Sequence, residues 1–240
     1  MRVLLLLFIL LFNTPCLKAQ NKELSQARSC IKSGKDLDKA KQTLWKLLPT
    51  GELSANDSVK VCYTLYQVLK KQYEMGNESL YLKQKYDTAS IFSVVKEMFE
   101  VACMLDTVDA KPDKNGTVKA KYRRKHANEL AQYKSNLYYG GAYFIKNKDY
   151  QRAYSFFDLY LRFNKLPLFA DAGYAEKDRM TIKAAYWATY CAYKQNDMEQ
   201  VPLRATLALE EKEKKVYTLQ YLAEAYQALG DSDNYLKFLN

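Results

Sequence analysis

The sequence predicts an all-α fold. Apolar residues recur three and four positions apart along most of the chain, the spacing of one face of a helix. One such series comprises Val59, Cys62, Tyr66, Leu69 and Tyr73. We find no sustained alternation of polar and apolar residues that would indicate a strand. The chain also has only 8 Gly and 5 Pro in 240 residues, too few for the many tight turns of an all-β protein.

The start of the chain, up to Ala19, has the parts of a secretory signal peptide. Arg2 precedes an unbroken apolar run at 3–12, and Ala19 offers a small side chain before Gln20. A run of this length spans only about 15 Å as a helix, half of a bilayer core, so a permanent anchor is not expected. We predict cleavage after Ala19, which separates a signal peptide at 1–19 from a mature domain at 20–240. The alternative is a lipid anchor on Cys16, although Pro15 fits poorly in a lipid-attachment signal.

The mature chain is predicted to be a succession of helices joined by short loops. Several starts carry capping residues: Asp57 or Ser58, Asp87 or Thr88, and Asp231 or Ser232. Pro112 and Asn115-Gly116 mark an irregular loop at 106–118. No later stretch is long and apolar enough to span a membrane. The predicted helices are 22–33, 37–48, 57–74, 88–105, 117–131, 136–147, 150–163, 178–195, 198–209, 216–229 and 232–239.

One order of residue types recurs in several stretches of the chain. It consists of a small residue, an aromatic residue, a turn, and then further small and aromatic residues. In LYYGGAYFIKNKDYQRAYSFFDLYL the series is Gly141, Phe144, Asp149-Tyr150, Ala153, Phe157 and Tyr160. In LQYLAEAYQALGDSDNYLKFL it is Ala223, Tyr226, Gly230-Asp231, Tyr235 and Leu239. The stretch AYWATYCAYKQNDMEQVPLRATLAL lies between them, and its turn residue Asp197 corresponds to Asp231 of the later stretch.

This order resembles the tetratricopeptide repeat (TPR), a helix–turn–helix unit of about 34 residues, and the positions of Asp197 and Asp231 differ by one such unit. The resemblance implies a right-handed α-solenoid, in which each hairpin buries its faces against its neighbours. It covers units 134–165, 182–215 and 216–240, and also 21–50, where Arg28 replaces the small residue. The pair at 57–105 keeps neither the spacing nor the small residue. Segments such as KYRRKHANEL and NLYYGGAYF also resemble exported repeat proteins of Bacteroidetes, which implies the periplasm or cell envelope of a Gram-negative bacterium.

The same resemblance implies a binding groove. Five positions of each first helix line the concave face in this family, and tyrosine there suits the binding of a peptide or partner protein. The alternative is that these tyrosines pack between helices, since the chain has 21 of them. The residues that match the groove positions are Tyr138, Ile145, Lys146, Lys183, Tyr186, Tyr190, Tyr193 and Lys194.

A basic segment at 111–125 is the second candidate site. The whole chain carries a net charge of +10, and this segment holds seven basic residues against Asp113. Its main members are Lys119, Lys121, Arg123, Arg124 and Lys125. Such a cluster suits an acidic polymer or a membrane surface. A solvated loop is the alternative, and nucleic acid is not expected for an exported chain without a reading motif.

The sequence offers no catalytic, metal or cofactor site. His126 is the only histidine, and the chain lacks GxSxG, HExxH and phosphate-loop motifs. Export permits disulfides, but apolar helical surroundings favour buried thiols at Cys30, Cys62, Cys103 and Cys191. We therefore predict an exported, non-enzymatic scaffold without cofactors. Its partner and its oligomeric state are not encoded in any recognisable motif.

Overall fold

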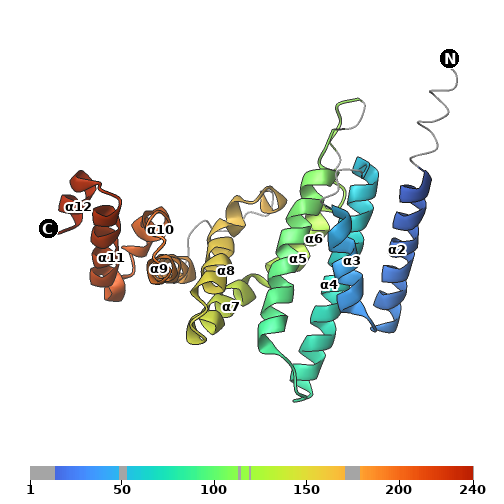
Figure 1. The fold of residues 1–240 in the computed structure, drawn as a ribbon, viewed down its shortest axis with the longest axis horizontal. Helices are drawn as coiled ribbons and strands as arrows, with labels where there is room; N and C mark the ends of the chain where they lie inside the picture. The colour runs from blue at the N-terminus through green and yellow to red at the C-terminus, as the bar shows by residue number, and fades with distance from the viewer. Residues whose placement is uncertain (1–13, 49–52, 113–114, 119, 171–178, 240) are drawn as a thin grey trace. The chain divides into compact units, whose positions relative to one another are not determined.

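The computed structural model describes residues 14–48, 53–112, 115–118, 120–170 and 179–239, and every regular element within them is a helix (Figure 1). The prediction of an all-α fold is therefore confirmed. The chain forms two compact units. The first comprises residues 1–87 and 97–123, and the second comprises 88–96 and 124–240. Helix α5 (Thr88–Asp109) contributes residues to both units.

The first unit packs α2 (Thr14–Ser33), α3 (Leu37–Leu47) and α4 (Ala55–Tyr81) against one another. Leu24, Leu44, Leu65 and Leu69 are among its buried apolar side chains. Residues 1–13 of the predicted signal peptide lie outside the described residues. The predicted cleavage point after Ala19 lies within α2, which begins at Thr14 rather than at residue 22.

Helix α4 begins earlier than the sequence analysis predicted. Its N-cap is Ser54, which accepts a hydrogen bond from the backbone N–H of Asp57 at 3.2 Å. The Ser54 hydroxyl also donates to the Asp57 carboxylate at 2.7 Å, and this bond is the main cause of the lowered pKa of Asp57. The prediction of Asp57 or Ser58 as the cap was wrong because a serine one turn earlier satisfies the free N–H groups.

Helix α4 also continues to Tyr81, well past the predicted end at residue 74. Gly76 does not end the helix because its missing side chain leaves room for Tyr86. A Cβ at Gly76 would lie only 2.5–2.9 Å from three atoms of the Tyr86 side chain. The glycine therefore serves close packing rather than a turn.

The predicted loop at 106–118 starts too early, because α5 continues to Asp109. Asp106 has 4 % of its surface exposed, and its carboxylate accepts two hydrogen bonds from the Arg123 guanidinium at 2.7 and 2.9 Å. The Asp109 carboxylate accepts from the backbone N–H of Tyr122 at 3.0 Å. These contacts fix the last turn of α5 to the start of α6 (Arg123–Ala131), which begins later than the predicted position 117.

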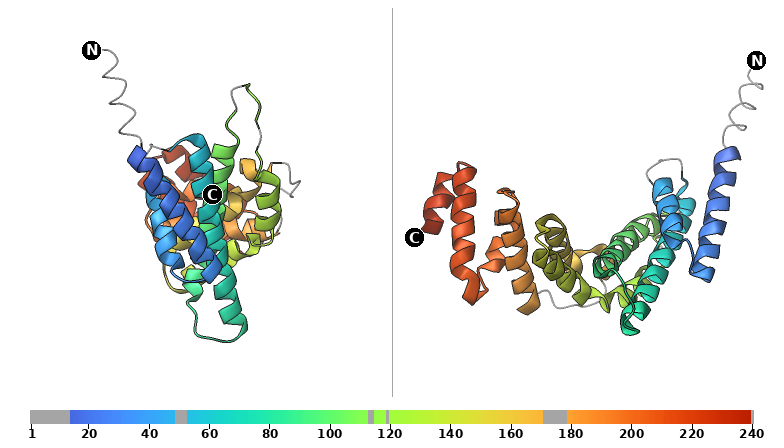
Figure 2. Two further views of the ribbon diagram at one scale, coloured as in Figure 1. Left: turned by 90° about the vertical axis from the view of Figure 1, so that its right-hand side faces the viewer. Right: turned by 60° about the horizontal axis from the view of Figure 1, so that its bottom comes forward.

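The second unit contains α7 (Lys134–Lys146), α8 (Tyr150–Arg162) and α9 (Arg179–Lys194), followed by α10 (Val201–Ala208), α11 (Lys215–Ala228) and α12 (Ser232–Leu239). From α7 onward each helix packs against the next one, and α9 also contacts both α7 and α11 (Figure 2). Short 3-10 helices at Phe163–Lys165, Pro167–Phe169 and Lys212–Lys214 fill the connections. Apart from α10, which starts at Val201 rather than 198, these helix ends lie close to the predicted ones.

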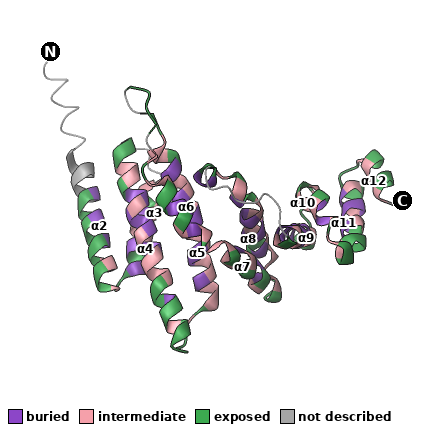
Figure 3. Cartoon of the chain, turned by 180° about the vertical axis from the view of Figure 1, so that it is seen from behind, coloured by how far each residue is buried: buried purple, intermediate pink, exposed green. Residues whose placement is uncertain are grey.

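Two glycines allow α7 and α8 to approach closely. A Cβ at Gly140 would lie 2.6 Å from the ring of Phe156, and one at Gly141 would lie 2.6 Å from the ring of Phe157. Both phenylalanines are buried. Buried positions continue along α8 and α9 (purple in Figure 3). In the core of this unit, aromatic rings of α8 therefore pack directly against the two glycines of α7.

One turn geometry occurs three times in the second unit. A residue in the left-handed region comes first, with φ between 57° and 73°, and an aspartate follows it. The pairs are Lys148-Asp149, Asn196-Asp197 and Gly230-Asp231. Each aspartate N–H donates to the carbonyl five positions earlier at 2.9–3.0 Å, and each carboxylate accepts from the N–H three positions later. The turn therefore closes one helix and caps the next.

Candidate functional site

The eight predicted groove residues lie on two contacting helices of the second unit. Helix α7 carries Tyr138, Ile145 and Lys146, and α9 carries the other five. Their exposure differs. Lys146 and Lys194 are exposed and Tyr186 is buried. The remaining five are half-buried.

Tyr186 belongs to the core rather than to an open surface. It packs with Tyr221 and small residues of α9, α10 and α11, and its hydroxyl donates a hydrogen bond to that of Tyr221. Burial raises the pKa of Tyr186 far above its ordinary value. The packing alternative from the sequence analysis therefore describes this residue well.

Tyr190 and Tyr193 border the same core with one side partly open. The Tyr193 ring stacks on Tyr221 at 4.4 Å between centroids, and its hydroxyl donates to a Glu224 oxygen at 2.6 Å. Tyr190 lies edge-on to Tyr150, with centroids 5.8 Å apart, and their hydroxyls hydrogen-bond. Burial is the main cause that raises the pKa of Tyr190 to about 12. Both hydroxyls are therefore protonated at neutral pH and act as hydrogen-bonding groups.

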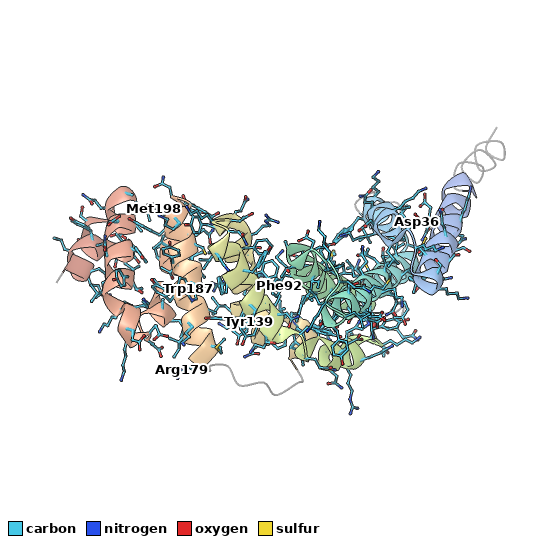
Figure 4. The ribbon with its side chains drawn as sticks, turned by 90° about the horizontal axis from the view of Figure 1, so that it is seen from below. Asp36, Phe92, Tyr139, Arg179, Trp187 and Met198 are labelled. Carbon is cyan, nitrogen blue, oxygen red and sulfur yellow. The ribbon has the colours of Figure 1, made fainter. Side chains whose placement is uncertain are left out.

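Tyr138 and Trp187 extend this arrangement from α9 to α7. The hydroxyl of Tyr138 is hydrogen-bonded by the Trp187 side chain, and the Trp187 ring lies 5.7 Å from that of Tyr190. Figure 4 labels Trp187 and the neighbouring α7 residue Tyr139. Aromatic contacts thus run without a break from α7 through α9 to α11. We call Tyr138, Trp187, Tyr190, Tyr193 and Tyr221 the aromatic row.

The lysines lie at the edge of the row. The Lys194 ammonium lies 5.9 Å from the centre of the Tyr150 ring, within the range of a cation–π contact. Lys183 is half-buried near the start of α9. Trp187, Tyr221 and Glu224 were not among the predicted groove residues. Tyr217, Tyr221 and Glu224 have the helical spacing of four and three, and this spacing was the available signal.

The hydrogen bond between Tyr193 and Glu224 should stabilise the fold to a degree that depends on pH. Bonds from Tyr193 and then Gln220 lower the pKa of Glu224 below its ordinary 4.5. A carboxyl group whose pKa is lowered by folding stabilises the folded state at pH values above its ordinary pKa of 4.5. This stabilisation is lost as the pH falls through the pKa of the folded state. Tyr193→Phe should therefore lower the free energy of unfolding by about 1 kcal/mol near pH 7, and by less in acid.

Urea unfolding at several pH values measures this difference. Tyr190→Phe is the matched control, because its hydroxyl pairs with another tyrosine hydroxyl and not with a carboxylate. Its effect should stay constant over the same pH values. A Tyr193→Phe effect that is equally independent of pH would show that the charged carboxylate does not contribute through this bond.

The basic segment is divided between the two units. Lys119 lies outside the described residues. Lys121 is exposed and belongs to the first unit, whereas Arg124 and Lys125 are exposed residues of the second. The guanidinium of Arg123 faces Asp106, so much of its charge is neutralised within the fold.

The remaining candidates for chemistry are largely withdrawn from solvent. His126 is 1 % exposed. The described structure shows Cys30, Cys62, Cys103 and Cys191 as free thiols, with Cys62 and Cys191 buried and the other two half-buried. Burial raises the thiol pKa of Cys62 to about 11 and that of Cys191 to about 12, which makes both poor nucleophiles. Within the described ranges, no group of three or more His, Cys, Asp or Glu side chains could hold a metal ion.

Comparisons with protein-family models, curated proteins and solved structures gave no match. None of the helices in the described part of the chain is long and apolar enough to cross a membrane.

Proposed function

We propose that this chain is an exported, non-enzymatic scaffold of TPR-like helical hairpins that binds a peptide or partner protein along the aromatic row. The proposal includes removal of residues 1–19 during export to the periplasm or cell envelope. The single observation that carries the binding function is the aromatic row itself. It joins three first helices, and it combines the buried ring of Tyr221 with four half-buried aromatic rings and their tyrosine hydroxyl groups.

Repetition of the turn supports the TPR-like assignment. Asp197 and Asp231 share the same turn and are separated by the length of one TPR unit, whereas Asp149 precedes Asp197 by more than one unit. The additional residues fall in the connection from α8 to α9, which includes two short 3-10 helices. An insertion between hairpins leaves the hairpins themselves intact. We therefore assign α7/α8, α9/α10 and α11/α12 as three successive repeats.

Helix packing supports the same assignment. In this repeat, a small residue of the first helix allows the second helix to approach, and Gly141 does so for Phe157. The second helix of one pair then contacts the first helix of the next, as α8 contacts α9 and α10 contacts α11. First helices also contact one another, from α7 to α9 and from α9 to α11. This pattern favours a position of the aromatic row on successive first helices, where a solenoid has its concave face.

The chemistry of the row favours a polypeptide ligand. Tyrosine side chains offer a large apolar area and a hydroxyl at a small cost in side-chain entropy. Gln220 is exposed beside Glu224 and donates to it at 2.9 Å, so its carboxamide oxygen stays available to a ligand. Lys194 adds one positive charge at the edge. The combination suits an extended segment with apolar side chains and backbone hydrogen-bonding groups.

A peptide selection tests the proposal. Residues 20–240 would be immobilised, peptides would be selected from a phage-displayed library, and their Kd values would be measured. We expect the double variant Tyr190→Ala/Tyr193→Ala to weaken binding at least about tenfold, the loss of a central interface contact. Tyr186 stays unchanged, because its burial would confuse loss of binding with loss of fold.

Two further variants make the result decisive. Lys194→Glu alters an exposed edge residue, and we expect weaker binding with unchanged circular dichroism. Tyr81→Ala removes an exposed tyrosine from the first unit and should leave the Kd unchanged. Failure to enrich any peptide, or equal affinity for wild type and both groove variants, would contradict the proposal. Binding that depends on Lys121, Arg124 and Lys125 would instead support an acidic ligand on the basic segment.

A further inference from the structure

The end of α4 carries the most exposed aromatic side chain among the large hydrophobic residues described. Tyr81 is 85 % exposed, and its neighbours Leu82 and Leu80 are 54 % and 42 % exposed. Single exposed apolar residues are common on protein surfaces, but three consecutive large ones indicate a contact site. The structure so far assigns them no partner, and they are far in sequence from the aromatic row.

The turn that presents these residues is well defined. Lys83 adopts the left-handed conformation with φ 56°, and backbone N–H groups of Leu82, Lys83 and Gln84 donate to carbonyls of α4 at 2.8–3.0 Å. Tyr86 then packs over Gly76, which brings the chain back against the helix. The chain reversal therefore leaves Tyr81 and Leu82 at its outermost point. We call residues 80–85 the α4 tip.

The α4 tip projects from its own unit. Helix α4 has 27 residues and α3 has 11, so the last turns of α4 extend beyond the helix that covers its first half. Figures 1 and 2 both show this end of α4 reaching past α2 and α3. A projecting turn can meet a flat surface without obstruction from the other helices of its unit.

The α4 tip itself carries two positive charges. Lys83 and Lys85 are both exposed, and no acidic residue occurs from position 79 to 86. Three exposed carboxylates flank the tip: Glu78 and Glu74 lie one and two turns back along the helix, and Asp87 follows it. Tyrosine and leucine enter the interfacial region of a bilayer, and lysine ammonium groups remain beside the lipid headgroups. Anionic headgroups then add an electrostatic attraction.

From these observations we propose that the α4 tip docks on an anionic lipid surface. Tyr81 and Leu82 enter the boundary between headgroups and acyl chains, and Lys83 and Lys85 contact the lipid phosphates. This surface is independent of the aromatic row and belongs to the other unit. A protein that holds a peptide along the row would be held at a membrane by the α4 tip.

Fluorescence at the tip tests this directly. The full chain with Tyr81→Trp would be mixed with phosphatidylcholine vesicles that contain phosphatidylglycerol, with brominated acyl chains as quenchers. The signal of Trp45 and Trp187 is subtracted with the parent chain. We expect quenching at position 81 with anionic vesicles and little with pure phosphatidylcholine. This readout is local, so binding through the apolar run at residues 3–12 would not imitate it.

Flotation of the mature chain, residues 20–240, with the same vesicles compares variants without the apolar run at residues 3–12. Tyr81→Ser/Leu82→Ser should lower the bound fraction strongly, and Lys83→Gln/Lys85→Gln should cost about fivefold per lysine and weaken the salt dependence. Tyr139→Ser/Leu203→Ser removes the same residue types from exposed positions of the second unit and should change nothing. Because all six positions are exposed, circular dichroism should be unaltered.

The outcomes are separate from those of the peptide selection. Quenching at position 81 together with loss of flotation in the tip variants supports the proposal. Absence of quenching, or equal flotation of wild type and Tyr81→Ser/Leu82→Ser, overturns it whatever the peptide experiment shows. Capture of a protein through the tip without any vesicle binding would overturn it as well.

Discussion

Replacing Gly141 by alanine is expected to lower the free energy of unfolding by about 2 kcal/mol. Helix propensity alone predicts the opposite sign, since alanine stabilises a helix interior by about 1 kcal/mol relative to glycine. The new Cβ, however, would lie 2.6 Å from the ring of Phe157, which is completely buried and cannot move outward. Overpacking of a core typically costs about 1–3 kcal/mol.

Ala142→Gly is the matched control on the next, exposed residue of α7. It should cost about 1 kcal/mol from helix propensity alone. Both changes should therefore destabilise, although they alter glycine content in opposite directions. Urea unfolding followed by circular dichroism measures the two effects. An increase in stability for Gly141→Ala would refute the close approach of α7 and α8, and with it the main packing support for a TPR-like hairpin.

The second large effect is expected at Arg123. Arg123→Ala would leave the Asp106 carboxylate, which is 4 % exposed, without its two charge-assisted hydrogen bonds. Breaking a buried ion pair costs about 3–5 kcal/mol, and the partial exposure of the Arg123 side chain reduces this to about 3 kcal/mol. Asp106→Ala should cost less, because the guanidinium left behind reaches water.

A double-mutant cycle tests the asymmetry. Adding Asp106→Ala to Arg123→Ala should restore part of the lost stability, since the pair is then removed without a buried charge. Arg124→Ala, at the exposed neighbouring position, should change the free energy of unfolding by less than about 0.5 kcal/mol. Additive effects at Arg123 and Asp106 would show that the ion pair does not join α5 to α6. The result also separates Arg123 from the ligand-binding role predicted for the basic segment.

Much of the fold followed from local sequence. Apolar spacing of three and four identified nearly every helix, because the period of a helix is imposed on whichever residues face the core. The Asp231 cap was readable because an aspartate before a helix satisfies its free N–H groups. The small residue at Gly141 was readable for a similar reason, since only glycine or alanine permits a close helix contact.

Long-range contacts decided what the sequence analysis missed. The helix around Gly76 was predicted to have ended, but Tyr86 occupies the space above this glycine and α4 continues to Tyr81. Asp106 was predicted to start a loop, but Arg123 binds its carboxylate and the helix extends to Asp109. In both cases the decisive partner lies beyond the helix itself, outside the range of any local pattern.

The candidate site divides in the same way. The sequence by itself determined that tyrosines recur along α9 and that the turn is repeated, because both depend on spacing within one helical period. Only the tertiary structure decided which tyrosines are core and which are partly open, and it added Trp187, Tyr221 and Glu224. The physical reason is that exposure and hydrogen bonding depend on which helix packs alongside, and residues such as Tyr193 and Glu224 meet only after α9 and α11 have come together.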